Sequence, residues 1–260
     1  MIRGLYTSAI GMGIQQKRLD TVSNNLANAN TAGFNRDVVV TQSFSDLLAH
    51  RVRDLELRGH NVIGSAQLGP MSLGITINTV HRDFSMGSIS HTGGPLDLAM
   101  DDIGFFRVAY VSSEGEMTEM FSRNGSFTLN YEGFLMTLGG FHVLDAGGNP
   151  IQLPNGEIVI SELGQITVGG QDIAVLSMVS FESLADLRPF GHNLYTAIEE
   201  AVEMPFAGRL HQGYLESSNV NVIREMVEMI SLSRAYEANS RMVSIQDDTL
   251  RQAVNEIARA

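Results

Sequence analysis

The feature that most constrains the fold is the C-terminal stretch, residues 219–260. No Gly follows Gly213 and no Pro follows Pro205, so nothing in the composition interrupts a long helix there. A period of seven between apolar residues is typical of a helix that packs along another helix. At about 1.5 Å per residue this helix would be roughly 55 Å long, so we expect it to need a partner. The apolar line consists of Met229, Tyr236, Val243, Leu250 and Ile257, with Met226 and Ile230 beside it.

A second helical pattern occupies residues 1–29. Leu5, Met12, Leu19 and Leu26 are also seven residues apart, and Val22 lies alongside them on a helical wheel. Gly residues in this segment each weaken a helix by up to about 1 kcal/mol relative to Ala, so packing must supply the order. Turn-forming residues at 28–33 should end the helix. This segment is therefore the predicted partner of the C-terminal helix.

The middle of the chain changes to a β pattern. Short runs with alternating or β-branched residues are separated by Gly-rich turns, which predicts an antiparallel β-domain or barrel. Asn155-Gly156 is a dipeptide favoured in tight hairpins. The predicted strands are 75–80, 105–111, 127–129, 134–137, 141–144, 157–160, 166–168 and 173–181.

The predicted fold class is α+β, with the terminal helices paired as a coiled-coil-like stalk and a barrel-like β-rich middle. Residues 1–34 and 217–260 form the paired helices, and residues 75–216 form the β-rich outer domain. Residues 35–74 are an extended or loop connector. Within it Phe44, Leu47, Leu48 and Val52 repeat at helical spacing, whereas 59–74 reads as a loop.

Charge is distributed unevenly along the chain, whose formal net charge is −12. Residues 1–60 carry seven basic against five acidic residues, and 217–260 carry five against six, but 61–216 carry five against eighteen. The near-neutral ends can pack against protein at little electrostatic cost, while the acidic middle suits a solvated surface. No basic stripe indicates nucleic-acid binding.

Composition also excludes several classes of site. Cysteine is absent, which excludes disulfides, Cys-ligated zinc and Cys nucleophiles. No apolar run approaches the roughly 18 residues of a membrane span. The first residues lack a clean small-residue cleavage site, so we expect no cleaved signal peptide.

Several motifs in order along the chain resemble those of bacterial flagellar rod and hook proteins. The run from Leu19 to Phe34 resembles the N-terminal signature, and Gly213–Val220 resembles the start of the terminal helix. Residues 121–127 and 193–195 resemble internal motifs. Asn35 departs from the pattern, because the family usually has Lys there. The motif residues are Asn24, Asn25, Leu26, Ala27, Asn28, Gly33, Phe34, Asn219, Arg234, Tyr236 and Glu237.

The resemblance is best to the FlgF/FlgG type, and residues 44–48 and 234–239 favour the distal over the proximal rod protein. It implies a structural, non-enzymatic subunit that assembles helically, with other copies and with neighbouring rod and hook subunits, into the axial drive shaft. It also implies export by the flagellar export apparatus without a cleaved leader, a place in the periplasm-spanning basal-body rod, and no cofactor or metal. The expected assembly interface comprises Leu5, Met12, Leu19, Val22, Leu26, Met226, Met229, Ile230, Tyr236, Val243, Leu250 and Ile257.

Other interpretations remain open at this point. Asp97, Asp101 and Asp102 with His81 and His91 could form a hydrolytic or metal cluster, which would make the protein a carbohydrate- or wall-acting enzyme. An acidic loop surface is the simpler interpretation, because no catalytic motif is present. A cytoplasmic coiled-coil adaptor is a further alternative. The Asn cluster at 24–30 either forms a recognition sequence or ends the helix and makes polar interhelix contacts.

Overall fold

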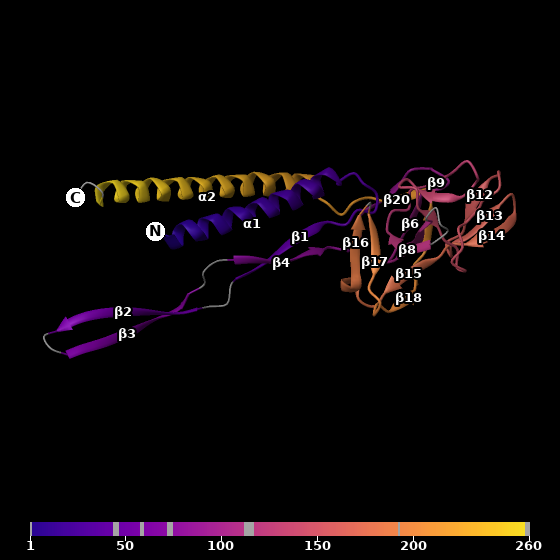
Figure 1. Ribbon diagram of the computed structural model, residues 1–260. Coiled ribbons are helices and arrows are strands. Elements are labelled where there is room, and N and C mark those ends of the chain that lie inside the picture. Colours follow the sequence, from indigo (N-terminus) through magenta and orange to yellow (C-terminus); the bar gives the residue numbers. More distant parts are fainter. Residues whose placement is uncertain are drawn as a thin grey trace. The chain divides into compact units, whose positions relative to one another are not determined.

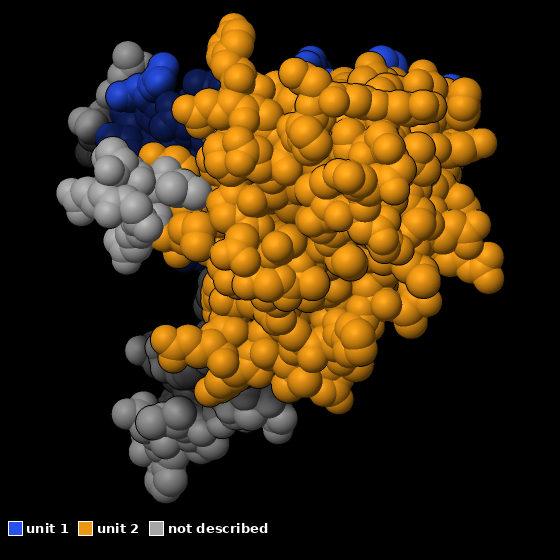
Figure 2. Space-filling view, turned by 90° about the vertical axis from the view of Figure 1, so that its right-hand side faces the viewer, with its two compact units in different colours: residues 1–25, 37–81, 223–260 blue, residues 26–36, 82–222 orange. Residues whose placement is uncertain are grey.

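A computed structural model describes residues 2–43, 47–57, 60–71, 75–111, 117–191 and 193–257. The chain divides into two compact units, which are coloured separately in Figure 2. Unit 1 comprises residues 1–25, 37–81 and 223–260, and unit 2 comprises residues 26–36 and 82–222. Each unit therefore contains segments that are far apart in the sequence.

Unit 1 is built on two helices. Helix α1 spans Ile2–Ala27 and α2 spans Val222–Ile257, and the two lie side by side and run in opposite directions (Figure 1). Helix α1 gives way to a turn at residues 28–33, as predicted, and Gly33 adopts a positive φ of 64°. Asn221 directly precedes α2, which is the N-cap position that a short polar side chain favours.

Two strand pairs complete unit 1. Strand β1 (Asp37–Ser43) pairs with β4 (Ile75–Arg82), and β2 (Leu47–Leu57) pairs antiparallel with β3 (His60–Met71). The helical interpretation of residues 47–52 and the loop interpretation of 60–71 are therefore wrong; Phe44 lies outside the described residues. A few apolar residues at helical spacing also fit a strand, and the pairing with a partner strand decides between the two.

Unit 2 is β-rich. Its largest sheet has the antiparallel order β16-β17-β8-β7-β11-β10-β9, and β15 joins it by pairing with both β7 and β18. Strands β12, β13 and β14 form a separate sheet, while β6 pairs with β19 and β5 with β20. Over the described residues the strands do not close into a barrel, so the barrel-like part of the prediction is wrong. Once paired partners lie far apart in the chain, local patterns cannot specify whether a sheet closes.

The remaining strands of the chain are short, and most span three to five residues. The strands are β5 Ile89–His91, β6 Leu98–Met100, β7 Phe105–Val111, β8 Met117–Ser122, β9 Phe127–Leu129, β10 Leu135–Thr137, β11 His142–Val143, β12 Ile158–Ile160, β13 Gln165–Val168, β14 Gln171–Val175, β15 Met178–Phe181, β16 Leu187–Gly191, β17 Leu194–Ala197, β18 Glu203–Pro205, β19 Leu210–Gln212 and β20 Tyr214–Glu216. A short 3-10 helix covers Leu184–Asp186.

Two turns differ from the expectation. The predicted single strand over 173–181 is two strands, β14 and β15, with Leu176 and Ser177 between them. Asn155-Gly156 precedes β12 without closing a hairpin, so that prediction is wrong. Gly169-Gly170 instead makes the two-residue turn between β13 and β14, and both residues adopt the positive φ that such a turn requires.

Strand β7 separates the two hydrophobic clusters of unit 2. Phe106 and Val108 point into a large cluster that also contains Leu135 and Ile166. Phe105 points into a second, aromatic cluster with Phe121, Phe181 and Tyr195. Consecutive side chains of a strand point to opposite faces, so two adjacent buried phenylalanines mark a strand that is covered on both sides.

Candidate assembly interface

The two helices of unit 1 touch along a line of polar residues and glycines. On α1 the contacted positions advance in steps of seven, from Gly4 to Asn25. On α2 Gln246, Asn239 and Glu225 run back at intervals of seven and fourteen, as an antiparallel pair requires, and Glu228 lies off that line. Arg18 Nη2 bonds Glu228 Oε1 at 3.0 Å, and Asn25 Nδ2 bonds Glu225 Oε2 at 3.3 Å. We call this set the polar contact line: Gly4 with Gln246, Gly11 with Asn239, Arg18 with Glu228, and Asn25 with Glu225.

The predicted apolar residues lie beside this line and are mostly half-buried. Val22 is buried, and the structure adds two buried residues that the prediction missed, Ile14 and Leu232. Leu232 lies seven residues from both Glu225 and Asn239, and a mostly polar heptad line gives no hydrophobic signal. The half-buried members are Leu5, Met12, Leu19, Leu26, Met229, Tyr236, Val243 and Leu250; the side chain of Ile257 lies outside the described residues.

A second apolar face of α2 is exposed. Ile223, Met226, Val227 and Ile230 follow one another at the i, i+3, i+4, i+7 spacing that places side chains on one side of a helix. Their exposed fractions are 76%, 48%, 62% and 56%. We call this set the outer stripe. It includes Met226 and Ile230 of the predicted interface, and no residue within the described part of the chain buries it.

Asn25 anchors the C-terminal end of α1. Its side chain is 1% exposed and makes two bonds with the backbone of Asp37, from Nδ2 to the carbonyl and from the Asp37 amide to Oδ1, both 2.9 Å. The third contact is the one with Glu225, which is also 1% exposed. Asn24 is exposed and Asn28 is half-buried, with Asn28 Oδ1 accepting from Thr31 Oγ1 at 3.3 Å. Within the Asn cluster, Asn25 thus makes interhelix and strand contacts.

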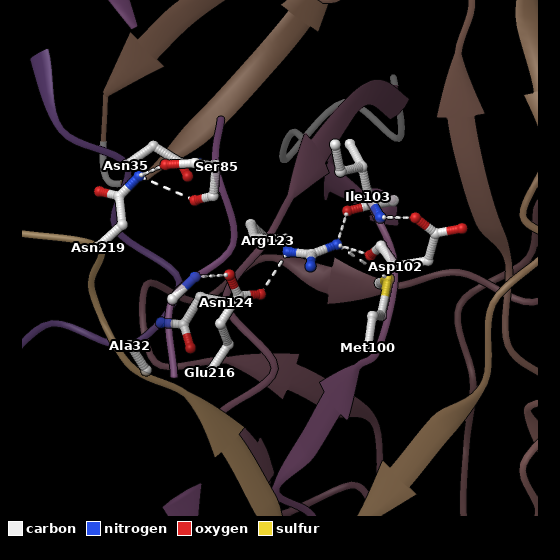
Figure 3. A network of polar contacts seen from close by, with 12 residues as sticks. Ala32, Asn35, Ser85, Met100, Asp102, Ile103, Arg123, Asn124, Glu216 and Asn219 are labelled. Atoms are coloured by element: carbon white, nitrogen blue, oxygen red, sulfur yellow. Dashed lines mark hydrogen bonds and ion pairs between the residues drawn. The ribbon is translucent and has the colours of Figure 1, made fainter. Parts of the chain in front are cut away.

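Unit 2 contains a buried ion pair at the segment that leads into α2. Arg123 Nε bonds Glu216 Oε2 at 2.5 Å, and the two side chains are 5% and 6% exposed. The other end of the guanidinium donates to the carbonyls of Asp102 and Gly104, at 2.6 and 2.7 Å. Glu216 Oε1 accepts from the amide of Gly87 at 2.9 Å. Figure 3 shows Arg123 between Glu216 and the loop that carries Asp102.

Gly33 and Phe34 of the motif, and Asn35 after them, contact the same region of unit 2. The Gly33 amide donates to the Glu216 carbonyl at 2.8 Å, and a Cβ at Gly33 would lie 2.7 Å from the Arg123 backbone. Asn35, which replaces the family's usual Lys, is buried and donates to the hydroxyl of Tyr195 at 3.0 Å. Phe34 is 7% exposed. Close backbone contact and burial explain why a glycine, an aromatic ring and a neutral amide stand here.

Asn219 joins three segments of unit 2. Its Oδ1 accepts from the Arg36 amide at 2.8 Å, while Nδ2 donates to the carbonyls of Asp83 and Ser85 at 2.8 and 2.9 Å. Figure 3 shows the contact between Asn219 and Ser85. The side chain therefore binds the loop after α1 and the segment after β4, and it does not cap α2. The remaining motif residues on α2, Arg234 and Glu237, are exposed.

The acidic residues considered for catalysis serve the loops in which they lie. Asp97 Oδ2 accepts from Thr92 Oγ1 at 2.6 Å, and Asp101 Oδ1 accepts from the Arg209 amide at 2.5 Å. Asp102 Oδ1 accepts from the next amide in the chain. Among the described residues no group of three His, Cys, Asp or Glu side chains could hold a metal ion. Over the same residues, no helix combines the length and apolarity needed to cross a membrane.

Comparison with known proteins gives consistent matches along the chain. Residues 5–35 match the family described as "Flagella basal body rod protein", residues 99–168 match "Flagellar hook protein FlgE/F/G D1 domain", and residues 211–256 match "Flagellar basal body rod FlgEFG protein C-terminal". The ends that form α1 and α2 and the β-rich middle are thus each matched separately.

Whole-chain relatives agree. The chain is 33% identical to the flagellar basal-body rod protein FlgG of Bacillus subtilis, over 98% of this chain and 99% of that protein. It is 31% identical to the flagellar basal-body rod protein FlgF of Caulobacter vibrioides, over 100% of this chain and 99% of that protein. It is 28% identical to the flagellar hook-basal body complex protein FlhO of Bacillus subtilis, over the full length of both. The chain belongs to the family of FlgF/FlgG-type flagellar basal-body rod proteins.

Proposed function

We propose that the protein is a structural subunit of the flagellar basal-body rod, and that copies associate through the helices of unit 1. Membership of the rod-protein family carries the proposal. The rival interpretations, a wall-acting enzyme and a cytoplasmic adaptor, find no support among the relatives. Neighbouring rod and hook subunits and the flagellar export apparatus are the further partners. The proposed place is the periplasm-spanning rod, reached without a cleaved leader, where the subunit transmits torque from motor to hook.

Within that function, the outer stripe is our proposed contact with a second copy. Four apolar side chains on one face would lose contact with water when a helix of another subunit covers them, which favours association. Charge supports the same choice. Unit 1 carries eleven basic and eleven acidic residues, whereas unit 2 carries six and eighteen, so copies of unit 1 approach one another without net repulsion.

The predicted interface residues then divide into two groups. The half-buried residues beside the polar contact line, such as Met229 and Tyr236, hold α1 and α2 together within a subunit. Met226 and Ile230, with Ile223 and Val227, face the neighbouring copy. For the place along the rod we favour the distal segment, on the resemblance of residues 44–48 and 234–239 to the distal type.

An Ile230→Asp substitution tests this assignment. A carboxylate on the outer stripe would have to be buried without a partner when copies associate, so we expect assembly of the purified full-length chain to fail. Light scattering and electron microscopy measure assembly, and circular dichroism checks that the fold is kept. Ser240→Asp, at an exposed position ten residues beyond Ile230 and past the end of the stripe, is the matched control. Normal assembly of Ile230→Asp would contradict the role of the stripe.

A further inference from the structure

The glycines of α1 that face α2 are placed opposite polar side chains. A Cβ at Gly11 would lie 3.1 Å from Asn239 Nδ2, and a Cβ at Gly4 would lie 2.5 Å from Gln246 Nε2. Both distances are closer than ordinary van der Waals contact, so any larger residue would displace the opposing amide. Gly13 differs, because nothing lies within 4 Å of the corresponding position. Gly4 and Gly11 are therefore notches that receive the side chains of Gln246 and Asn239.

The apolar residues cannot define how far α1 lies along α2. On both helices they recur every seven residues, so a shift by one heptad, about 10.5 Å, would again place apolar side chains opposite one another. The polar contact line does not repeat in this way. After a shift in one direction Asn25 would face Leu232 and Gly11 would face Gln246. After a shift in the other direction Asn25 would lie beyond the start of α2 and Gly11 would face Leu232.

Polar groups at such positions reduce stability and select one arrangement. A shifted pairing would separate the buried Asn25 and Glu225 side chains and break the hydrogen bond between them, which disfavours it. A cost is visible in the observed pairing too: the Oε1 atom of Gln246 is enclosed and has no hydrogen-bond partner among the described residues. A purely apolar contact would not carry that cost.

We propose that the polar contact line fixes a single register between α1 and α2, with Asn239 and Gln246 seated in the Gly11 and Gly4 notches and Asn25 paired with Glu225 at the far end. Asn25, Asn239 and Gln246 are thus specificity-determining residues of the helix pair. This inference concerns the packing within one subunit and holds independently of the proposed function.

Because the chain contains no cysteine, pairs of introduced cysteines can measure the register between α1 and α2. Gly4→Cys with Gln246→Cys reports the observed register, and Gly4→Cys with Ala253→Cys reports a shift by one heptad. A short bifunctional thiol reagent bridges the distance that the Gln246 side chain spans, which is longer than a disulfide allows. Reaction at low protein concentration, followed by separation of monomeric products, excludes links between copies. We expect the first pair to link and the second to link about tenfold less, because both chains keep Gly11, Asn239, Asn25 and Glu225.

The same pairs are then compared in a chain that carries Asn25→Leu and Asn239→Leu. We expect the preference for the observed register to fall about tenfold, because the two amides that distinguish the observed register from the shifted one are then apolar. A chain with Asn24→Leu and Ser240→Leu, at exposed positions beside the line, should keep it. An unchanged preference in the first variant would overturn the proposal. So would the loss of both products in a variant that circular dichroism shows to be folded, since an apolar contact should pair at least as well.

The notch itself has a separate test. Gly11→Leu should reduce the Gly4→Cys/Gln246→Cys link several-fold, whereas Gly13→Leu, with the same gain in helix propensity, should not. Adding Asn239→Ala to Gly11→Leu should restore the link, because the smaller residue frees the space. Equal cross-link yields for the Gly11→Leu and Gly13→Leu variants would show that the Gly11 notch does not set the register.

Discussion

At the residue scale, buried polar side chains determine how separate segments of the chain are joined. Arg123, Glu216 and Asn219 connect segments around residues 33–36, 83–87, 102–104 and 216–219 within unit 2. Sequence motifs could identify these residues as important to the family, but not their partners. A hydrogen-bond network between distant segments is a property of the tertiary fold, which no local spacing reveals.

Arg123→Met should destabilise unit 2 by about 3–5 kcal/mol, because it leaves the Glu216 carboxylate buried without its charge partner. The double variant Arg123→Met/Glu216→Met should lose clearly less than the sum of the two single losses. Urea unfolding measures each free energy. Arg209 and Glu162 form an ion pair at 67% and 62% side-chain exposure and provide the control, for which we expect about 0–1 kcal/mol. Additive losses at Arg123 and Glu216 would contradict the account.

Asn25→Asp should give unit 1 a pH-dependent stability. The new carboxylate would face Glu225 within a buried contact, so at about pH 7 repulsion and desolvation destabilise the fold. The folded state then binds a proton more readily than the unfolded chain, and the loss of stability should shrink as the pH falls toward about 5. Thermal unfolding across this range measures the trend. Asn24→Asp adds the same charge at an exposed site, so its stability should change little with pH. A loss of stability in Asn25→Asp that does not depend on pH would argue against the contact between residue 25 and Glu225.

At the element scale, the sequence predicted the helices and many strands well, because their periodicity is local. Strand β7 was predicted with its observed bounds, and the end of α1 in the 28–33 turn was also correct. The prediction for α2 found only one of its two heptad lines. The other line carries Glu225, Asn239 and Gln246. Hydrophobic periodicity detects only apolar residues, so it cannot identify polar residues that face a partner helix. Strands β2 and β3 were missed because pairing overrides ambiguous spacing.

The composition of the helix pair predicts its stability relative to the sheet. Glycines, amides and half-exposed apolar residues line the α1–α2 contact. Residues 105–108 of β7 and 120–122 of β8, in contrast, lie between two hydrophobic clusters. Backbone amides in α1 and α2 should therefore exchange with solvent at least about tenfold faster than those of β7 and β8. Hydrogen exchange on the dilute full-length protein measures this. Equal protection of the helix and sheet amides from exchange would show that the polar contact line does not lower the stability of the helix pair.

At the scale of the whole molecule, charge and apolar surface are divided between the two units. Unit 1 is neutral and exposes the outer stripe, while unit 2 carries the entire formal net charge of −12. Such a division suits a subunit whose helices pack against other copies while its β-rich part remains in contact with water. The sequence alone indicated this division, since its acidic residues concentrate between 61 and 216.

The location of the protein in the cell tests the central proposal most directly. Basal bodies isolated from cells that produce the protein with an epitope tag on the chain can be labelled with gold-coupled antibody and imaged by electron microscopy. The rod proposal predicts label on the rod of intact basal bodies and its loss from the Ile230→Asp strain. Label confined to the cytoplasm, with unlabelled and complete rods, would contradict it.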